Sequence, residues 1–255
     1  MKRFPDRCYD VGICEQHALT MAAGMAAEGM RPVVALYSTF LQRGYDQVLH
    51  DICLMKLPVV IAVDRAGLVG EDGETHQGVY DPAFLSTMPG LTIYSPATQQ
   101  ELVRMLSLAI QRGEPAAVRY NRGCLMQMVS GVPVEPGKWE VLEPVSACTV
   151  IATGNMVELA LPVARETGAG LINARTIKPL DREALAAAFA VSKRVIVLEE
   201  CVDCLGKAVA AEATDCRVIR MCAPDRPIPQ ATVAEQREMC GLTAERLTAL
   251  IREAL

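Results

Sequence analysis

Apolar, β-branched runs alternate with helical stretches along this chain, and that alternation constrains the fold more than any other feature. In the first half, helical periodicity covers residues 41–56 and 98–112. Alternating strands and helices predict βα units and a parallel sheet. With 51% apolar but only 4% aromatic residues, the core is aliphatic, which favours a helix-covered sheet over a β-sandwich. The strand candidates of this half are 32–37, 57–63, 91–95 and 116–120.

The alternation is interrupted once, at residues 123–147, where three prolines and repeated glycines break all periodicity. We interpret this stretch as a linker with one edge strand. The pattern then restarts, with helices predicted at its end over 232–239 and 243–255. The expected architecture is α/β, with two three-layer domains built on parallel sheets. Their predicted bounds are 1–124 and 145–255, joined by a linker at 125–144, and the strands of the second are 148–153, 170–174, 194–199 and 217–221.

Charge and hydropathy exclude several classes of protein. The net charge of −5 argues against a nucleic-acid-binding surface, which needs clustered lysine and arginine. No run of about 18 apolar residues predicts a membrane span, and residues 1–10 carry no charged-then-apolar leader. We therefore expect a cytoplasmic protein with no nucleic-acid or membrane partner.

Ten scattered cysteines favour reduced thiols that pack as small apolar residues. Cys201 and Cys204 form a lone CxxC, for which a metal or redox role stays open as the alternative. No second CxxC or histidine pair completes a tetrahedral site, so we expect no metal on this chain.

Four features carry candidate chemistry. Glu15 opens an alanine-rich helix, where a glutamate is ordinarily favoured by the helix dipole alone. Tyr37, Phe40 and Arg43 follow a predicted strand, and ligands of open α/β sheets bind at the carboxyl ends of strands. On spacing alone, Phe40 would be a core aromatic.

The third feature is the loop 67–78, with four glycines that let the backbone approach a ligand closely. A solvated acidic turn explains its glutamates but not His76, a residue suited to proton transfer near neutral pH. Asp72 lies in the same loop. The fourth feature is Arg122 at a strand end, where a guanidinium group binds phosphate well, although a salt-bridged surface arginine is the ordinary alternative.

Together these segments resemble the pyrimidine-binding domain of thiamine-diphosphate enzymes, most closely the 1-deoxy-D-xylulose-5-phosphate synthases. The loop sequence GEDGETHQ at 70–77 is similar in transketolases too, whereas DRAG at 64–67 and YSTFLQR at 37–43 are closer to the synthases. Residues 145–255 resemble the transketolase C-terminal domain. The sequence departs from the family pattern at two places. Asn121 stands where the family has a proline, and the turn at 201–206 is nearly free of the glycines that the family has there.

The resemblance implies a role for each residue at the cofactor. Glu15 would hydrogen-bond N1′ of the aminopyrimidine, as a catalytic group, and Phe40 would stack on the pyrimidine ring. Tyr37 and Arg43 would lie beside both cofactor and substrate.

At the substrate, His76 would be the catalytic acid and base, and Asp72 would contact the acceptor. Arg122 would bind the phosphate of D-glyceraldehyde 3-phosphate. The implied reaction joins pyruvate to this acceptor with loss of CO₂, and its product feeds isoprenoid and thiamine biosynthesis.

The resemblance also implies missing parts. No GDG…N motif for Mg²⁺ and diphosphate is present, and the first strand and helix of the pyrimidine domain are absent, so that domain is incomplete at its N-terminus. This chain would hold only the pyrimidine end of thiamine diphosphate, and an N-terminal partner would carry the Mg²⁺. The expected assembly is a homodimer or a heterotetramer. Without the N-terminal partner, we expect no catalytic activity. Two alternatives are the C-terminal subunit of a split transketolase and a non-catalytic binding subunit.

Overall fold

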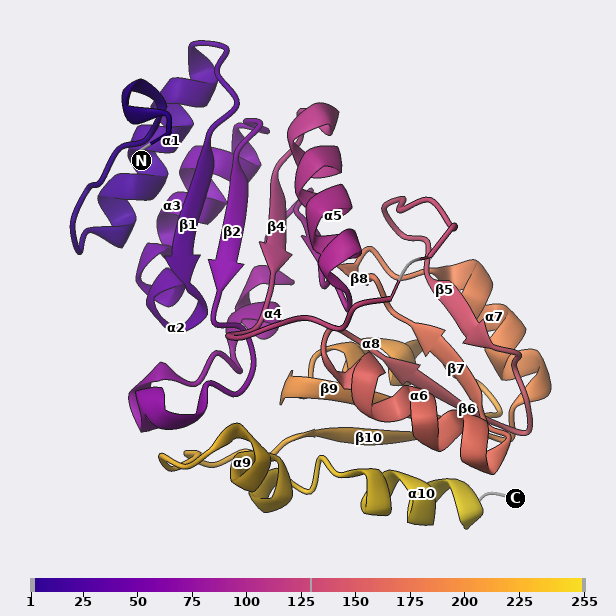
Figure 1. The fold of residues 1–255 in the computed structure, drawn as a ribbon. Helices are drawn as coiled ribbons and strands as arrows, with labels where there is room; N and C mark the ends of the chain where they lie inside the picture. Colours follow the sequence, from indigo (N-terminus) through magenta and orange to yellow (C-terminus); the bar gives the residue numbers. More distant parts are fainter. Residues whose placement is uncertain (1–2, 129, 254–255) are drawn as a thin grey trace.

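Two five-stranded sheets form the framework of the protein in a computed structural model that describes residues 3–128 and 130–253 (Figure 1). The strand order of the first sheet is β1-β2-β4-β3-β8, in which the first four strands are parallel and β8 is antiparallel to β3. Its strands are β1 (Val33–Tyr37), β2 (Val60–Asp64), β3 (Thr92–Tyr94), β4 (Ala116–Arg119) and β8 (Thr176–Lys178).

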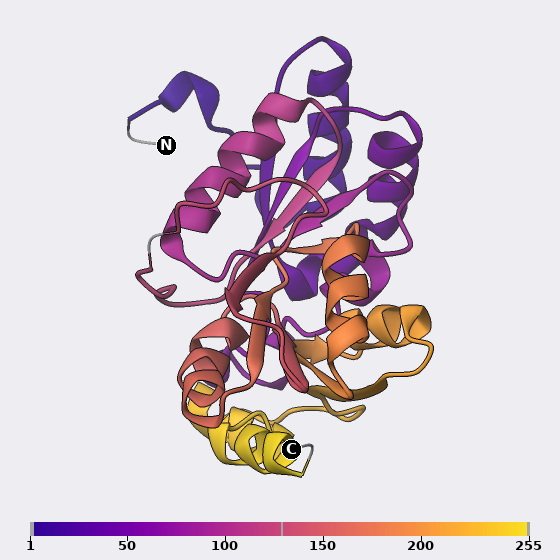
Figure 2. The ribbon, with the colours of Figure 1, turned by 90° about the vertical axis from the view of Figure 1, so that its right-hand side faces the viewer.

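Helices cover both faces of this sheet, and Figure 2 shows the strands between the two layers. On one face lies α5 (Gln99–Arg112), whose N-cap Thr98 accepts a hydrogen bond from the Glu101 backbone at 3.0 Å. The other face is covered by shorter segments. They are α1 (Glu15–Ala27), α2 (Ser38–Leu41), the π-helical turn η3 (Val48–Leu54) and α4 (Asp81–Leu85), while the short helix α3 (Tyr45–Gln47) before η3 buries none of its residues.

The helical periodicity predicted over 41–56 is confirmed, but the segment is not one regular α-helix. The chain passes from α2 through a 3₁₀ turn, η2 (Gln42–Gly44), into α3 and then widens into η3. The break coincides with Gly44, where a Cβ atom would collide with Leu19 of α1. Close approach of α1 thus accompanies the change in helical geometry, and a sequence period cannot report such a contact.

The second sheet has the order β10-β9-β6-β7-β5, and only β5 is antiparallel to its neighbour. The edge strand predicted within the linker region is β5. These strands are β5 (Glu140–Glu143), β6 (Cys148–Ala152), β7 (Gly170–Asn173), β9 (Arg194–Val202) and β10 (Arg217–Ala223). The predicted α/β fold is confirmed, and each sheet has one antiparallel edge strand, of which β5 was predicted and β8 was not.

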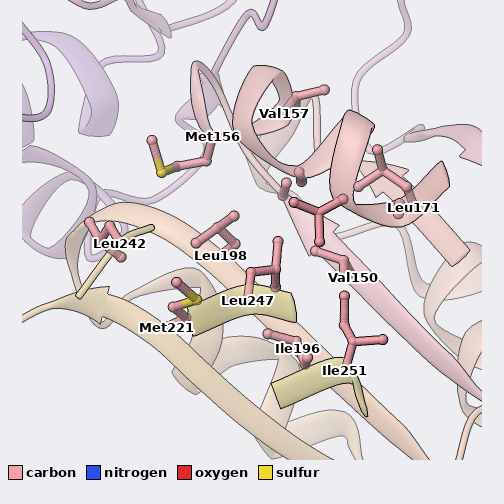
Figure 3. Packing of buried hydrophobic residues seen from close by; sticks show 14 of the residues in the cluster. Val150, Met156, Val157, Leu171, Ile196, Leu198, Met221, Leu242, Leu247 and Ile251 are labelled. Atoms are coloured by element: carbon pink, nitrogen blue, oxygen red, sulfur yellow. The ribbon is translucent and has the colours of Figure 1, made fainter. Parts of the chain in front are cut away.

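Alternate residues of β6 face opposite helix layers. Val150 packs toward α6 (Met156–Thr167) and α10 (Ala244–Arg252), in the cluster shown in Figure 3. Ile151 packs toward α7 (Arg182–Val191) and α8 (Leu205–Glu212). The remaining helix, α9 (Val233–Cys240), follows β10 and packs through Cys240 into the same cluster as α6 and α10. Within the described residues, no helix combines the length and apolar character needed to cross a membrane.

The two sheets are joined by a buried ionic cluster. Arg175, only 1% exposed, lies between β7 and β8. Its Nε donates to Glu101 of α5 at 2.6 Å, and its Nη2 donates to Glu140 of β5 at 2.6 Å. Asn173 also donates to Glu101, at 2.9 Å. These bonds connect α5, which covers the first sheet, with β5 of the second sheet, and breaking such a buried pair is costly.

Candidate functional site

The candidate residues gather where β1, β2 and β4 end. Tyr37 is the last residue of β1, Asp64 closes β2, and Arg122 follows β4. Parallel strands present their carboxyl ends at one edge of the sheet, which is where α/β folds bind ligands. The 3₁₀ turns η4 (Gly70–Asp72) and η5 (Glu74–His76) form the loop above this edge.

Glu15 is the first residue of α1 and is buried, at 6% exposure. Small side chains such as Ala18 and Ala22 let α1 pack closely onto the first sheet, and this closeness shields the carboxylate. Oε1 of Glu15 accepts a hydrogen bond from Nη1 of Arg43 at 3.1 Å. The Arg43 side chain remains half exposed, so the buried carboxylate has a partner that can move.

Two stacked rings lie next to this ion pair. The rings of Tyr37 and Phe40 have centroids 5.4 Å apart and an interplanar angle of 13°. The guanidinium carbon of Arg43 lies 5.2 Å from the Phe40 centroid, within cation–π range. The ring of His76 meets Phe40 edge-on at 5.3 Å.

Asp72 joins two arginines. Its Oδ1 accepts from Nη1 of Arg122 at 2.7 Å, and its Oδ2 accepts from Nε of Arg65 at 2.9 Å. The guanidinium carbon of Arg65 also lies 3.9 Å from the centre of the Tyr37 ring. Burial alone would lower the pKa of Arg65, but the hydrogen bond to Asp72 and nearby negative charges outweigh it and raise that pKa.

Sequence reasoning missed Arg65 as a member of this group. It has a positive φ of 55°, which turns the chain out of β2 and back over Tyr37. The DRAG element pointed to this position, but the pairing with Asp72 arises only from folding.

The structure brings all the predicted residues into one continuous set of contacts. Two carboxylates, two aromatic rings and three arginines form this chain of contacts, and an imidazole lies against one of the rings. Such a set suits a planar heterocycle with a hydrogen-bond donor, next to an anionic group. In contact order the residues are Glu15, Arg43, Phe40, Tyr37, Arg65, Asp72 and Arg122, with His76 against Phe40.

The CxxC cysteines lie apart from this set and make packing and capping contacts. Sγ of the buried Cys201 donates to Glu199 at 2.9 Å, and burial followed by the charge of Glu199 raises the pKa of this thiol well above its usual value. Glu199 also accepts backbone N–H groups at the start of α8, including that of Gly206 at 2.8 Å. A carboxylate thus holds the turn that departs from the glycine-rich family pattern. Among the described residues, no three His, Cys, Asp or Glu side chains cluster as a metal site.

Comparison with known families and proteins agrees with this arrangement. The transketolase pyrimidine-binding domain model matches residues 1–127, and the transketolase C-terminal domain model matches residues 137–247. The 1-deoxy-D-xylulose-5-phosphate synthase of Clostridium tetani is 46% identical over 99% of this chain, and that of Desulforudis audaxviator is 47% identical over 96%. The chain spans 42% and 41% of these two relatives, respectively.

Solved structures show the same fold. A split-gene transketolase, described as an inactive β4 tetramer, matches all of this chain and 86% of its own with a TM-score of 0.91 and 28% identity. The transketolase of Campylobacter jejuni matches 95% of this chain and 39% of its own, with a TM-score of 0.82 and 20% identity. This chain therefore belongs to the transketolase family, of which it carries the pyrimidine-binding and C-terminal domains, and it is similar in sequence to the 1-deoxy-D-xylulose-5-phosphate synthases.

Proposed function

We propose that this chain supplies the pyrimidine-binding part of a thiamine-diphosphate-dependent transferase that condenses pyruvate with D-glyceraldehyde 3-phosphate and releases CO₂. The observation that carries the proposal is the buried carboxylate of Glu15, which Arg43 links to the half-buried ring of Phe40. The identity of 42–47% to synthases that carry out this type of chemistry supports it.

The residues present fit the aminopyrimidine end of the cofactor. Within the described part of the chain, Arg43 is the one hydrogen-bond partner of the Glu15 carboxylate, and it binds only Oε1. Glu15 would accept a hydrogen bond from the ring, Phe40 would stack on it, and Tyr37 and Arg43 would flank it. Bound thiamine diphosphate supplies the electron sink that decarboxylation needs. Its diphosphate and Mg²⁺ would be held on an N-terminal partner, since residues 1–255 contain no GDG…N motif for them.

The remaining residues act on the substrates. His76 would move a proton at the carbonyl and hydroxyl oxygens of the acceptor, at a position bordered by Phe40. Arg122 would bind the acceptor phosphate, and Asp72 orients that guanidinium group through their 2.7 Å contact. Arg65 stabilises the same aspartate from its other side.

Complementation tests the proposal. The chain alone should bind thiamine diphosphate with Mg²⁺ more weakly than micromolar in calorimetric titration, because the metal-bound diphosphate contributes most of the binding free energy. Mixed with the N-terminal part of the Clostridium tetani relative, it should release CO₂ from pyruvate when glyceraldehyde 3-phosphate is present. Micromolar binding by the chain alone would contradict the division of the site.

A second candidate is the C-terminal subunit of a split transketolase, which transfers a two-carbon ketol unit without decarboxylation. The TM-score of 0.91 over the whole chain to a split-gene transketolase favours it. In the same mixture, a ketose phosphate donor would then replace pyruvate. A mixture inactive with both donors would instead favour a non-catalytic binding subunit.

A further inference from the structure

The loop 67–78 is held at its base by side chains of the second domain. The backbone N–H of Leu68 donates to Oε2 of Glu200 at 3.3 Å, and that of Gly70 donates to Oε1 of Gln236 at 2.9 Å. Glu200 lies in β9 and Gln236 in α9, both far from the loop in sequence. The second domain therefore anchors two of the first residues of the loop.

Gln236 is fully buried and pairs with both backbone groups of Gly70. Its Nε2 donates to the Gly70 carbonyl at 3.3 Å, and also to the Pro229 carbonyl at 2.9 Å. Buried backbone groups that lose such partners are costly to leave unpaired. One side chain of α9 thus fixes the point where η4 begins.

Glu200 is itself fixed by two further residues. Its Oε1 accepts from Nε of Arg237 in α9 at 2.8 Å, and its Oε2 accepts from Nδ2 of Asn155 at 2.8 Å. Charge-assisted bonds of this kind hold a carboxylate in one position. The anchor at Leu68 is therefore rigid and also depends on α9.

The loop glycines meet this anchor directly. A Cβ on Gly67 would collide with Oε2 of Glu200. Gly70 has a φ of +71°, and a Cβ there would lie 3.2 Å from Cγ2 of Val233 and 3.3 Å from the carbonyl of Ala231. At these two positions glycine permits close approach of the second domain, where the sequence alone had suggested approach of a ligand.

We propose that Gln236 and Glu200 are positioning residues, through which the second domain sets the placement of Asp72 and His76 over the candidate site. The inference rests on the proposed function in one respect, namely that the loop carries catalytic residues. The contacts between the loop and the second domain need no ligand. Loss of the α9 contact should loosen the loop while Glu15 and Phe40, which belong to the first domain, stay in place.

Hydrogen exchange of the chain without any ligand tests this. Gln236→Met keeps the length of the side chain but removes its hydrogen bonds to Gly70. We expect backbone exchange in residues 70–76 to become at least about tenfold faster, while exchange in β6 is unchanged. The matched control is Cys240→Ala, which removes the thiol of a buried residue of the same helix that makes no hydrogen bond to the loop within the described residues. It should leave residues 70–76 at the parent rate.

The three histidines give a second readout by NMR. In Gln236→Met the ring signals of His76 should shift, while those of His17 and His50, which lie in α1 and η3, should not. Unchanged loop exchange, or equal acceleration by Cys240→Ala, would overturn the proposal.

If Gln236→Met does not fold, Glu200→Gln gives the same test. This variant keeps an acceptor for Leu68 but loses the ion pair to Arg237, and should accelerate exchange from residue 68 onward. Unaltered exchange there would also overturn the proposal. Neither measurement uses cofactor or substrate. Failure of the proposed function in the complementation assay can therefore be distinguished from failure of the positioning role in the exchange measurement.

Discussion

Arg43 donates a hydrogen bond to Glu15 across 3.1 Å while its guanidinium carbon lies 5.2 Å from the centre of the Phe40 ring. It therefore touches both groups that the proposed function assigns to the aminopyrimidine. Arg43 is half exposed, whereas the carboxylate of Glu15 is buried. A ligand that moves Arg43 aside must therefore itself donate a hydrogen bond to Glu15, because a buried carboxylate without a partner is costly.

Replacing Glu15 with glutamine should separate catalysis from folding. In the complemented complex, we expect turnover to fall by at least about 100-fold, the scale of a lost proton-transfer group. An amide oxygen still accepts from Arg43, so the melting temperature should change little. Turnover with pyruvate and calorimetric melting measure the two effects. Glu28→Gln, at the exposed end of α1, is the control and should alter neither. Near-normal turnover of Glu15→Gln would remove Glu15 from the mechanism.

Removal of the Arg122 guanidinium should affect only the phosphorylated substrate. Because a charge-assisted contact to phosphate is worth roughly 1.5–3 kcal/mol, Arg122→Ala should raise the KM for glyceraldehyde 3-phosphate by roughly 10- to 150-fold. The KM for pyruvate should stay nearly constant, and steady-state kinetics with each substrate varied in turn measures both.

Unphosphorylated glyceraldehyde is the matched acceptor for this comparison, and with it the variant and the parent should converge. Arg112→Ala, an exposed arginine paired with Glu114, should behave as the parent with both acceptors. An equal rise in KM with both acceptors would show that Arg122 has a structural role. Arg65, which also pairs with Asp72, would then be the next candidate for the phosphate site.

Folding should be sensitive to loss of the buried ionic cluster around Arg175. Arg175→Met leaves the carboxylates of Glu101 and Glu140 buried without their guanidinium partner. Breaking a buried pair in this way costs about 3–5 kcal/mol of unfolding free energy, measured by urea denaturation. Arg182→Met, which removes an exposed pair to Glu212, should cost less than about 1 kcal/mol. Similar losses in both variants would contradict the role assigned to the buried cluster.

The sequence was sufficient for features that depend on local pattern. The alternation of strands and helices predicted both sheets, and the helix predicted over 98–112 agrees with α5. The short strand β8 was not predicted, because its three residues follow β7 almost directly and pair with β3 of the other domain. Arg65 was missed for a related reason, since its backbone conformation and its bond to Asp72 exist only in the folded chain. What the sequence could not predict are contacts between segments distant in the chain.

Stability in alkaline solution should depend on the buried thiol of Cys53. Burial raises its pKa to about 11, against a smaller opposing effect of the Lys178 charge. In the unfolded chain the thiol ionises near its usual value, so above that pH the unfolded state has lost a proton that the folded state keeps. The stabilisation is complete below the unfolded pKa and is lost as pH rises toward about 11.

Urea denaturation in reducing buffer between pH 8 and pH 11 measures this loss. Over this range the unfolding free energy of Cys53→Ala should decline by about 1–2 kcal/mol less than that of the parent. This difference in decline does not depend on how stable the variant is at pH 8. Cys8→Ala removes an exposed thiol and should reproduce the decline of the parent. Because other buried thiols titrate in the same range, including Cys148 with a pKa raised to about 11, Cys53→Ala should reduce the decline without abolishing it. An identical decline in Cys53→Ala and the parent would show that Cys53 ionises alike in both states, and that water reaches it in the folded protein.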